Sequence, residues 1–173
     1  DERGCIRSEK SLGKKVRGDL DGKMICVSLC AKSGSEVREG MKAARSAGAD
    51  LVEIRADFLE NLGEIEEILN EKPLPVLVTL RSEREGGRFS GTDEELFSFL
   101  QEAAANGADW VDVEWKRYRP FEVGKSRLVL SWHDTERTPE DLGDVYSQMK
   151  SVGADLVKIA VRANGVKDLL RLL

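Results

Sequence analysis

Short apolar runs alternate with longer amphipathic segments along most of the chain. Apolar runs bounded by turn residues predict buried strands, and segments with a 3.6-residue apolar period predict helices. The predicted strands lie at 24–30, 50–56, 75–81, 109–115, 128–133 and 155–161. The predicted helices lie at 33–48, 62–70, 92–106 and 138–152, and a further helix begins near 165.

Capping signals support these helix starts. Ser33 with Glu36 and Thr92 with Glu95 have the spacing of a capping box, in which a hydroxyl and a carboxylate each accept a backbone N–H. Thr138, followed by proline, predicts a third N-cap. The connection at 116–127 has too little periodicity for a full helix.

One sequence motif, called the repeated phrase below, occurs three times in the chain. It occurs as AGADLVEIRA at 47–56, NGADWVDVEW at 106–115 and VGADLVKIAV at 152–161. Each copy contains Gly-Ala-Asp, which we interpret as a helix end, a tight turn and the entry to a strand. Each strand then carries charge inside an apolar run, and an unpaired charge there would be costly.

The alternation predicts an α/β fold with a parallel sheet and crossover helices. A (β/α)8 TIM barrel, of which about six βα units are present at 23–173, fits better than an open doubly wound sheet. The end of the first strand and the residues after it read SLCAKSGSE, which lacks the G-x-G-x-x-G fingerprint common in doubly wound folds. Residues 1–22 are basic and glycine-punctuated, and we interpret them as a leader or linker.

Residue parity assigns the charged side chains to one face of the sheet. Alternate strand residues share a face, and the face with Val, Ile and Leu suits the helices. The other face must line the barrel lumen, and barrel active sites lie toward the carboxyl ends of the strands. The charged residues assigned to the lumen are Glu53, Arg55, Arg81, Asp112, Glu114, His133 and Lys158, and Ser28 is the polar residue of the first strand.

Composition excludes several classes of function. The net charge of −5 and a pI near 5.2 argue against a nucleic-acid partner. No apolar run approaches the roughly 18 residues of a membrane span. The three cysteines, Cys5, Cys26 and Cys30, show no C-x-x-C spacing, so a zinc site is not expected, and their odd number suggests a reducing compartment such as the cytoplasm.

The lumenal residues suggest carbonyl chemistry. A lysine held away from water among other cations becomes a nucleophile that forms a Schiff base with a carbonyl. His133, the only histidine in the chain, is the candidate acid and base, and Glu53 could orient it. Arg55 and Arg81 would hold an oxygen-rich or anionic substrate. The predicted class is β-elimination or aldol-type chemistry on a small carbonyl compound, without metal or organic cofactor.

These stretches resemble a known family, the type I 3-dehydroquinate dehydratases, and the plant form fused to shikimate dehydrogenase in particular. The resemblance rests on ADLVEIRADFL, VTLRSEREGGRFSGTDEE, ADWVDVEW, LSWHDTERTP and ADLVKIAV, in the family's order. It implies dehydration of 3-dehydroquinate to 3-dehydroshikimate through an imine on Lys158, with His133 moving the protons. It also implies that Glu53, Arg55 and Arg81 bind substrate, that Ser28 lines the pocket and that Glu85 lies near the histidine.

The family pattern also implies residues that this sequence does not contain. In the family an arginine on the seventh strand, and Ser and Gln near the eighth, hold the substrate carboxylate. Trp132 stands where the family often has Asn. An inert barrel fragment or interaction module is therefore the alternative, and another Schiff-base aldolase is a third. The resemblance further suggests a homodimer or a fusion to a shikimate dehydrogenase domain, and a plastid location if the protein is from a plant.

Overall fold

The protein is a single curled parallel sheet with helices on its outer side. The computed structural model describes residues 24–172, so the predicted leader or linker at 1–22 lies outside the described residues. The strands are β1 (Cys26–Leu29), β2 (Leu51–Arg55), β3 (Val76–Thr79), β4 (Trp110–Glu114), β5 (Arg127–Asp134) and β6 (Leu156–Val161). Their order in the sheet is their order in the chain, and every neighbouring pair is parallel.

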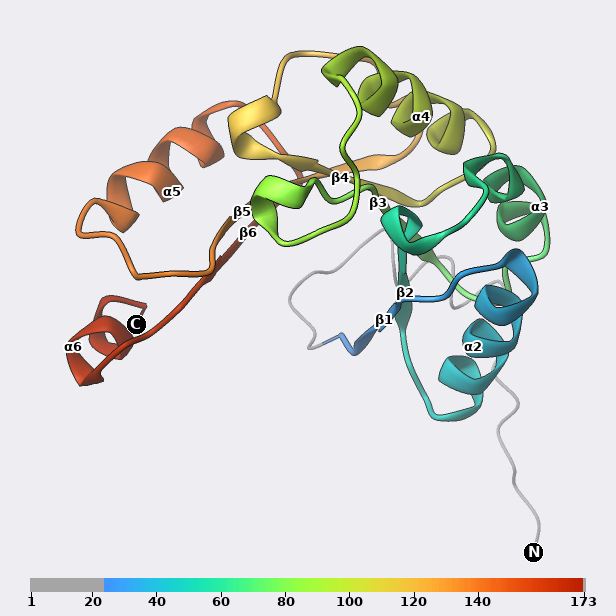
Figure 1. Cartoon of the computed structure of the whole chain (residues 1–173), viewed down its shortest axis with the longest axis horizontal. Coiled ribbons are helices and arrows are strands. Elements are labelled where there is room, and N and C mark those ends of the chain that lie inside the picture. The colour runs from blue at the N-terminus through green and yellow to red at the C-terminus, as the bar shows by residue number, and fades with distance from the viewer. Residues whose placement is uncertain (1–23, 173) are drawn as a thin grey trace, which may run out of the picture.

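Helices cover the convex face of this sheet, as Figure 1 shows for the four that connect its strands. The helices are α2 (Gly34–Ser46), α3 (Ile65–Asn70), α4 (Asp93–Ala105), α5 (Leu142–Ser151) and α6 (Val166–Arg171). Single 3-10 turns follow β2, β3 and β4, and one more precedes α3. The main core lies between strands and helices, where Val52 and Ile54 of β2 pack with Met41 of α2. The predicted α/β fold, a TIM-type barrel of which about six βα units are present, is thus confirmed for residues 24–172.

The structure confirms the predicted N-caps of two helices and contradicts that of a third. Thr92 and Glu95 form the full capping box, whereas Ser33 caps α2 but Glu36 accepts from the backbone N–H of Lys32 instead. The N-cap predicted at Thr138 is wrong, because α5 begins only at Leu142. The Thr138 hydroxyl donates instead to the carbonyl of Arg162, beyond β6, at 3.0 Å. A long-range bond has replaced the local cap.

The Gly-Ala-Asp phrase joins pairs of strands. Its glycines, Gly48, Gly107 and Gly153, all have left-handed backbones, with φ of 88°, 95° and 80°. The aspartates that follow, at positions 50, 109 and 155, accept the backbone N–H of Ile25, Val76 and Leu128 at 2.9–3.0 Å. Each of these donors lies at the start of the preceding strand. The phrase therefore ends a helix, turns, and fixes the register of two adjacent strands.

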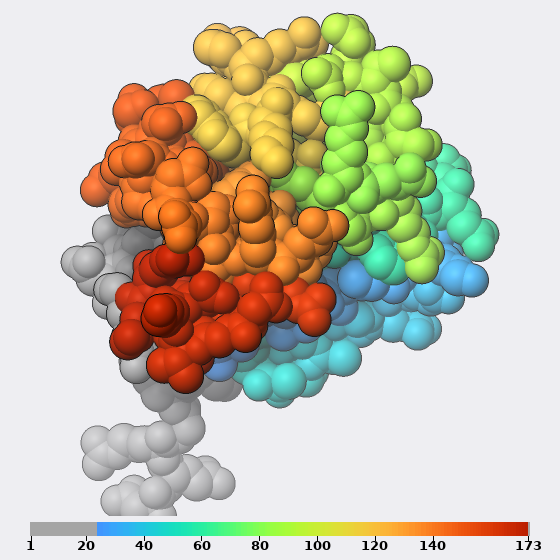
Figure 2. Space-filling model, turned by 60° about the vertical axis from the view of Figure 1, so that its left-hand side comes forward, coloured from blue at the N-terminus to red at the C-terminus, as the bar shows by residue number. Residues whose placement is uncertain are grey.

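The two outer strands of the described sheet are its least buried. No residue of β1 or β6 is fully buried, whereas every residue of β3 and β4 is. The C-terminal segment lies at the surface in Figure 2, and Val166, Leu169 and Leu170 of α6 are 54–72% exposed. Among the described residues, no helix has the length and apolar character needed to cross a membrane.

Candidate active site

The concave face of the sheet carries an apolar layer below a polar one. Leu51, Leu77, Trp110 and Val129 form a small cluster at the amino ends of their strands. Two residues further along these strands the side chains are polar or charged, as parity predicted. The structure brings together on this face Ser28, Glu53, Thr79, Asp112, Ser131 and Lys158, followed by Arg55, Arg81, Glu114 and His133.

Lys158 forms an ion pair that crosses the lumen. Its ammonium nitrogen lies 3.4 Å from Oε1 of Glu53, which also accepts from Thr79 at 2.8 Å, and Ser28 donates to the other oxygen. Burial alone would raise the pKa of Glu53, but the Lys158 charge and the hydrogen bonds from Ser28 and Thr79 hold that pKa below its usual range. The lysine expected to lie among cations is therefore next to a carboxylate, and its side chain is 38% exposed.

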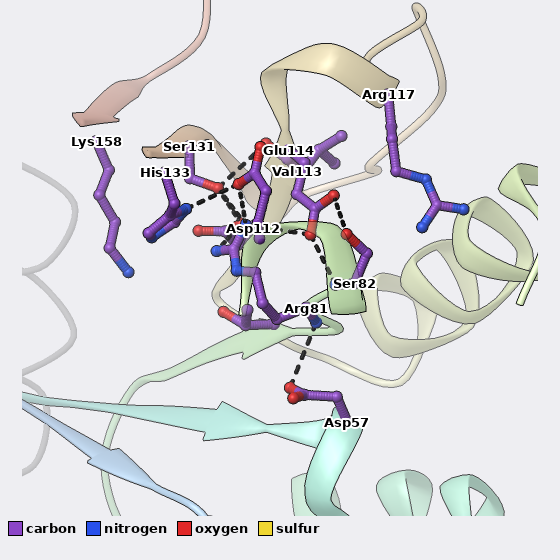
Figure 3. Close-up of polar contacts among 12 residues, drawn as sticks. Asp57, Arg81, Ser82, Asp112, Val113, Glu114, Arg117, Ser131, His133 and Lys158 are labelled. Atoms are coloured by element: carbon purple, nitrogen blue, oxygen red, sulfur yellow. Dashed lines mark hydrogen bonds and ion pairs between the residues drawn. The ribbon is translucent and has the colours of Figure 1, made fainter. Parts of the chain in front are cut away.

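Arg81 is the centre of a buried network on β3, β4 and β5 (Figure 3). Its guanidinium donates to Asp112 and to Ser131 at 2.8 Å and to Glu85 at 3.3 Å, and it lies 3.5 Å from Glu114. The Arg81 side chain is only 4% exposed. These donors bond protein acceptors, so a direct contact of Arg81 with substrate stays a prediction.

Glu85 links this network to the histidine. Its Oε2 lies 2.8 Å from Nδ1 of His133, and the same oxygen accepts from Arg81. Glu85 is held by a loop that folds back on the residues just after β3, since the N–H of Gly87 donates to the carbonyl of Ser82 and the N–H of Phe89 donates to the carbonyl of Arg81. A Cβ on Gly87 would lie 2.1 Å from the Arg81 carbonyl oxygen. Only glycine allows this close approach, which fixes the position of Glu85.

Arg55 is held by a residue that sequence reasoning missed. Asp57, whose side chain is fully buried, accepts two hydrogen bonds from the Arg55 guanidinium at 2.7 and 2.8 Å. These bonds raise the pKa of Arg55. The available signal was the R-x-D spacing at the carboxyl end of β2. Ser82 was also missed; its N–H and hydroxyl both donate to Glu114 at 2.7 Å.

A separate hollow lies beside the glycine-rich loop at 82–89. It has a volume of about 410 Å³, and its lining includes Arg84, Asp93 and Arg117, but neither Lys158 nor His133. Arg117 there is bonded to Asp93. The titratable groups with candidate chemistry are thus on the concave face and not in this hollow.

Two comparisons of sequence identify relatives. Residues 25–173 match the family model described as type I 3-dehydroquinase. The chain is 35% identical over 161 residues to the chloroplastic bifunctional 3-dehydroquinate dehydratase/shikimate dehydrogenase of Arabidopsis thaliana, covering 86% of this chain and 27% of that protein. It is 34% identical to the 3-dehydroquinate dehydratase of Methanococcus maripaludis, covering 87% of this chain and 72% of the relative.

Solved structures agree with the sequence relatives. The type I 3-dehydroquinate dehydratase of Clostridium difficile, crystallised with covalently modified comenic acid, superposes with a TM-score of 0.74 at 29% identity, covering 85% of this chain and 66% of that one. The enzyme of Aquifex aeolicus gives 0.69 at 32% identity, covering 87% and 72%. Nothing in these comparisons supports the inert-module alternative. The family match extends over nearly all described residues, and the chain belongs to the type I 3-dehydroquinase family.

Proposed function

We propose that this chain carries the imine-forming centre of a 3-dehydroquinate dehydratase, a hydro-lyase of the shikimate pathway. The observation that carries the proposal is the placement of Lys158 and His133 on neighbouring strands, each next to its own carboxylate. Lys158 lies 3.4 Å from Glu53, and His133 lies 2.8 Å from Glu85. Family membership supports the substrate, because the relatives are named for it.

The proposed reaction begins with an imine. The Lys158 amine adds to the C3 carbonyl of 3-dehydroquinate, and water leaves as the C=N bond forms. The iminium withdraws electrons and acidifies C2. His133 removes the C2 proton, the electron pair forms the C1–C2 double bond, and the hydroxyl on C1 leaves as water with the proton that His133 returns. Hydrolysis of the imine then releases 3-dehydroshikimate and restores the amine.

Glu85 and Glu53 have different roles in this scheme. Glu85 holds Nδ1 of His133, so the scheme uses Nε2 toward the substrate. Glu53 accepts the Lys158 ammonium before the reaction, and once the imine has formed it can pair with the positively charged iminium or bind a substrate hydroxyl. Ser28, Arg55, Arg81 and Glu85 complete the proposed substrate-binding set.

Borohydride trapping tests the proposal. The chain is incubated with 3-dehydroquinate and borohydride, and its intact mass and tryptic peptides are measured. We expect a reduced adduct on Lys158, none in Lys158→Ala, and an unchanged adduct in Lys150→Ala, which removes an exposed lysine of α5. A chain that is folded by circular dichroism and gives no adduct would refute the proposal. Adducts with aldol substrates but not with 3-dehydroquinate would favour an aldolase instead.

Assembly and location are further proposals that rest on the plant relative. That relative is named as a bifunctional, chloroplastic enzyme. We propose that this chain acts on a small-molecule substrate, either as a homodimer or joined to a shikimate dehydrogenase domain, in the cytoplasm or a plastid. Light scattering of the purified chain, and the size and organelle of the native protein, would decide among these.

A further inference from the structure

We propose that Asp57 is a positioning residue of this site, which fixes Arg55 and the glycine-rich loop at 82–89 in one arrangement. The inference rests on the proposed function, in which Arg55 contacts substrate. Asp57 itself reaches neither Lys158 nor His133 by any hydrogen bond or ion pair within residues 24–172.

The Asp57 carboxylate accepts four hydrogen bonds from three residues. Oδ1 accepts from Nε of Arg55 at 2.8 Å and from the backbone N–H of Arg81 at 3.3 Å. Oδ2 accepts from the Arg55 guanidinium at 2.7 Å and from the backbone N–H of Arg88 at 3.2 Å. Each oxygen thus takes one side-chain and one backbone donor. A carboxylate with no exposed surface is tolerable only with such complete partnering.

The geometry of the Arg55 pair restricts the guanidinium. Two parallel N–H···O bonds form a planar fork, which fixes the plane of the group as well as its distance. The Phe58 ring adds a second restraint, because its centroid lies 5.0 Å from Cζ of Arg55 and 3.9 Å from Cζ of Arg88. Arg55 keeps 20% of its side chain exposed. Asp57 and Phe58 therefore fix the orientation of the Arg55 side chain, while part of that side chain stays exposed to solvent.

The two backbone bonds extend the effect to the histidine. The N–H of Arg81 lies where β3 enters the loop, and the N–H of Arg88 lies near the loop's end. Between them the chain carries Glu85, which bonds His133. Asp57 therefore holds both ends of the segment that positions the histidine's carboxylate. Misplacing a substrate-contacting group by about 1 Å can lower rates about a hundredfold, so the loss of Asp57 should be measurable.

Asp57→Asn is the primary test, since it keeps the shape and removes the charge. The first readout is the Nε–H signal of Arg55 in a ¹⁵N NMR spectrum of the chain. We expect this signal to be protected from exchange in the wild type and to lose that protection in Asp57→Asn. The readout needs no substrate, so it decides the positioning role even if the wild type gives no borohydride adduct, an outcome that would refute the proposed function alone.

The second readout separates positioning from general damage. We expect the 3-dehydroquinate concentration that gives half-maximal trapping to rise at least about tenfold in Asp57→Asn, since a charge-assisted pair is lost. The adduct yield at saturation should change less than twofold. Asp93→Asn is the matched control, because it breaks another Asp–Arg pair beside the same loop, with Arg117, and should leave half-saturation unchanged.

Arg55→Gln supplies the second variant if Asp57→Asn does not fold. It leaves Asp57 and its two backbone donors in place, so the amide of Arg88 should stay protected while half-saturation rises as much as in Asp57→Asn. An unchanged Arg55 signal in Asp57→Asn, or unchanged half-saturation in Arg55→Gln, would overturn the inference.

Discussion

Replacing Arg81 with methionine would test whether one buried guanidinium holds the polar face together. Methionine keeps a flexible apolar side chain and removes every donor. Asp112, Glu85 and Glu114, whose side chains are 1–4% exposed, would then lose their cation. Removing one partner of a buried ion pair usually costs about 3–5 kcal/mol, because the other charge is left without compensation.

For a chain of this length, such a loss lowers the melting temperature by roughly 6–20 °C, at about 2–4 °C per kcal/mol. Urea unfolding followed by tryptophan fluorescence measures the free energy directly, since Trp110 lies in the lumen layer below the network. Arg137→Met is the control. Arg137 is 76% exposed and lies 3.8 Å from Asp134, so its replacement should change the free energy by no more than about 0.5 kcal/mol.

A second substitution checks the cause. In Arg81→Met/Asp112→Asn one of the uncompensated charges is removed, while the Ser131 hydroxyl still has an oxygen to bond. We expect the double variant to be more stable than Arg81→Met alone by about 1–3 kcal/mol. The reasoning is refuted if Arg81→Met costs less than about 1 kcal/mol, or if the second substitution adds to the loss.

Three further predictions concern single residues. The pKa of Glu53 is lowered in the folded chain, so its ionisation stabilises the fold above the ordinary pKa of 4.5, and this contribution is lost as the pH falls through the folded pKa. The difference in unfolding free energy between wild type and Glu53→Gln should therefore shrink in acid. A difference that does not depend on pH would contradict this prediction. Gly87→Ala should destabilise the chain because the new Cβ would meet a backbone carbonyl oxygen at 2.1 Å, whereas Gly143→Ala, in α5 with nothing within 4 Å, should stabilise it by about 0.5–1 kcal/mol in thermal unfolding. Asp109→Ala, which loses hydrogen bonds at the well-buried β3–β4 pair, should lower the free energy of unfolding by about 1–2 kcal/mol. Asp155→Ala, at the exposed β5–β6 pair, should lower it by less, and equal losses in the two variants would contradict the prediction.

Parity and periodicity predicted the fold and the face of the site because both depend on local geometry. Alternation along a strand needs no knowledge of its neighbours, so Glu53, Asp112 and Lys158 could be assigned to one face from their spacing alone. The structure places all three there. Strand boundaries were also close, since turn residues mark them in the sequence.

Partners across the sheet could not be predicted in the same way. Lys158 meets Glu53 across 105 residues of chain, and no local pattern says which lumenal charges touch. The cap expected at Thr138 is absent, since α5 begins only at Leu142, and the Thr138 hydroxyl instead donates to the carbonyl of Arg162, a long-range contact that no local pattern predicts. Asp57 lies in a 3-10 turn after β2, where strand parity no longer applies.

The three copies of the repeated phrase separate what serves the fold from what serves the site. The aspartate at the strand entry is the same in every copy and always accepts a backbone N–H of the preceding strand. The residues three and five positions later lie in the lumen and differ in every copy, as Glu and Arg, Asp and Glu, and Lys and Ala. A shared structural task requires the same residue, whereas one site needs complementary residues. The variation within the repeat thus follows the proposed site, in which the Lys158 amine on β6 needs a carboxylate from β2 and substrate-binding groups from the other copies.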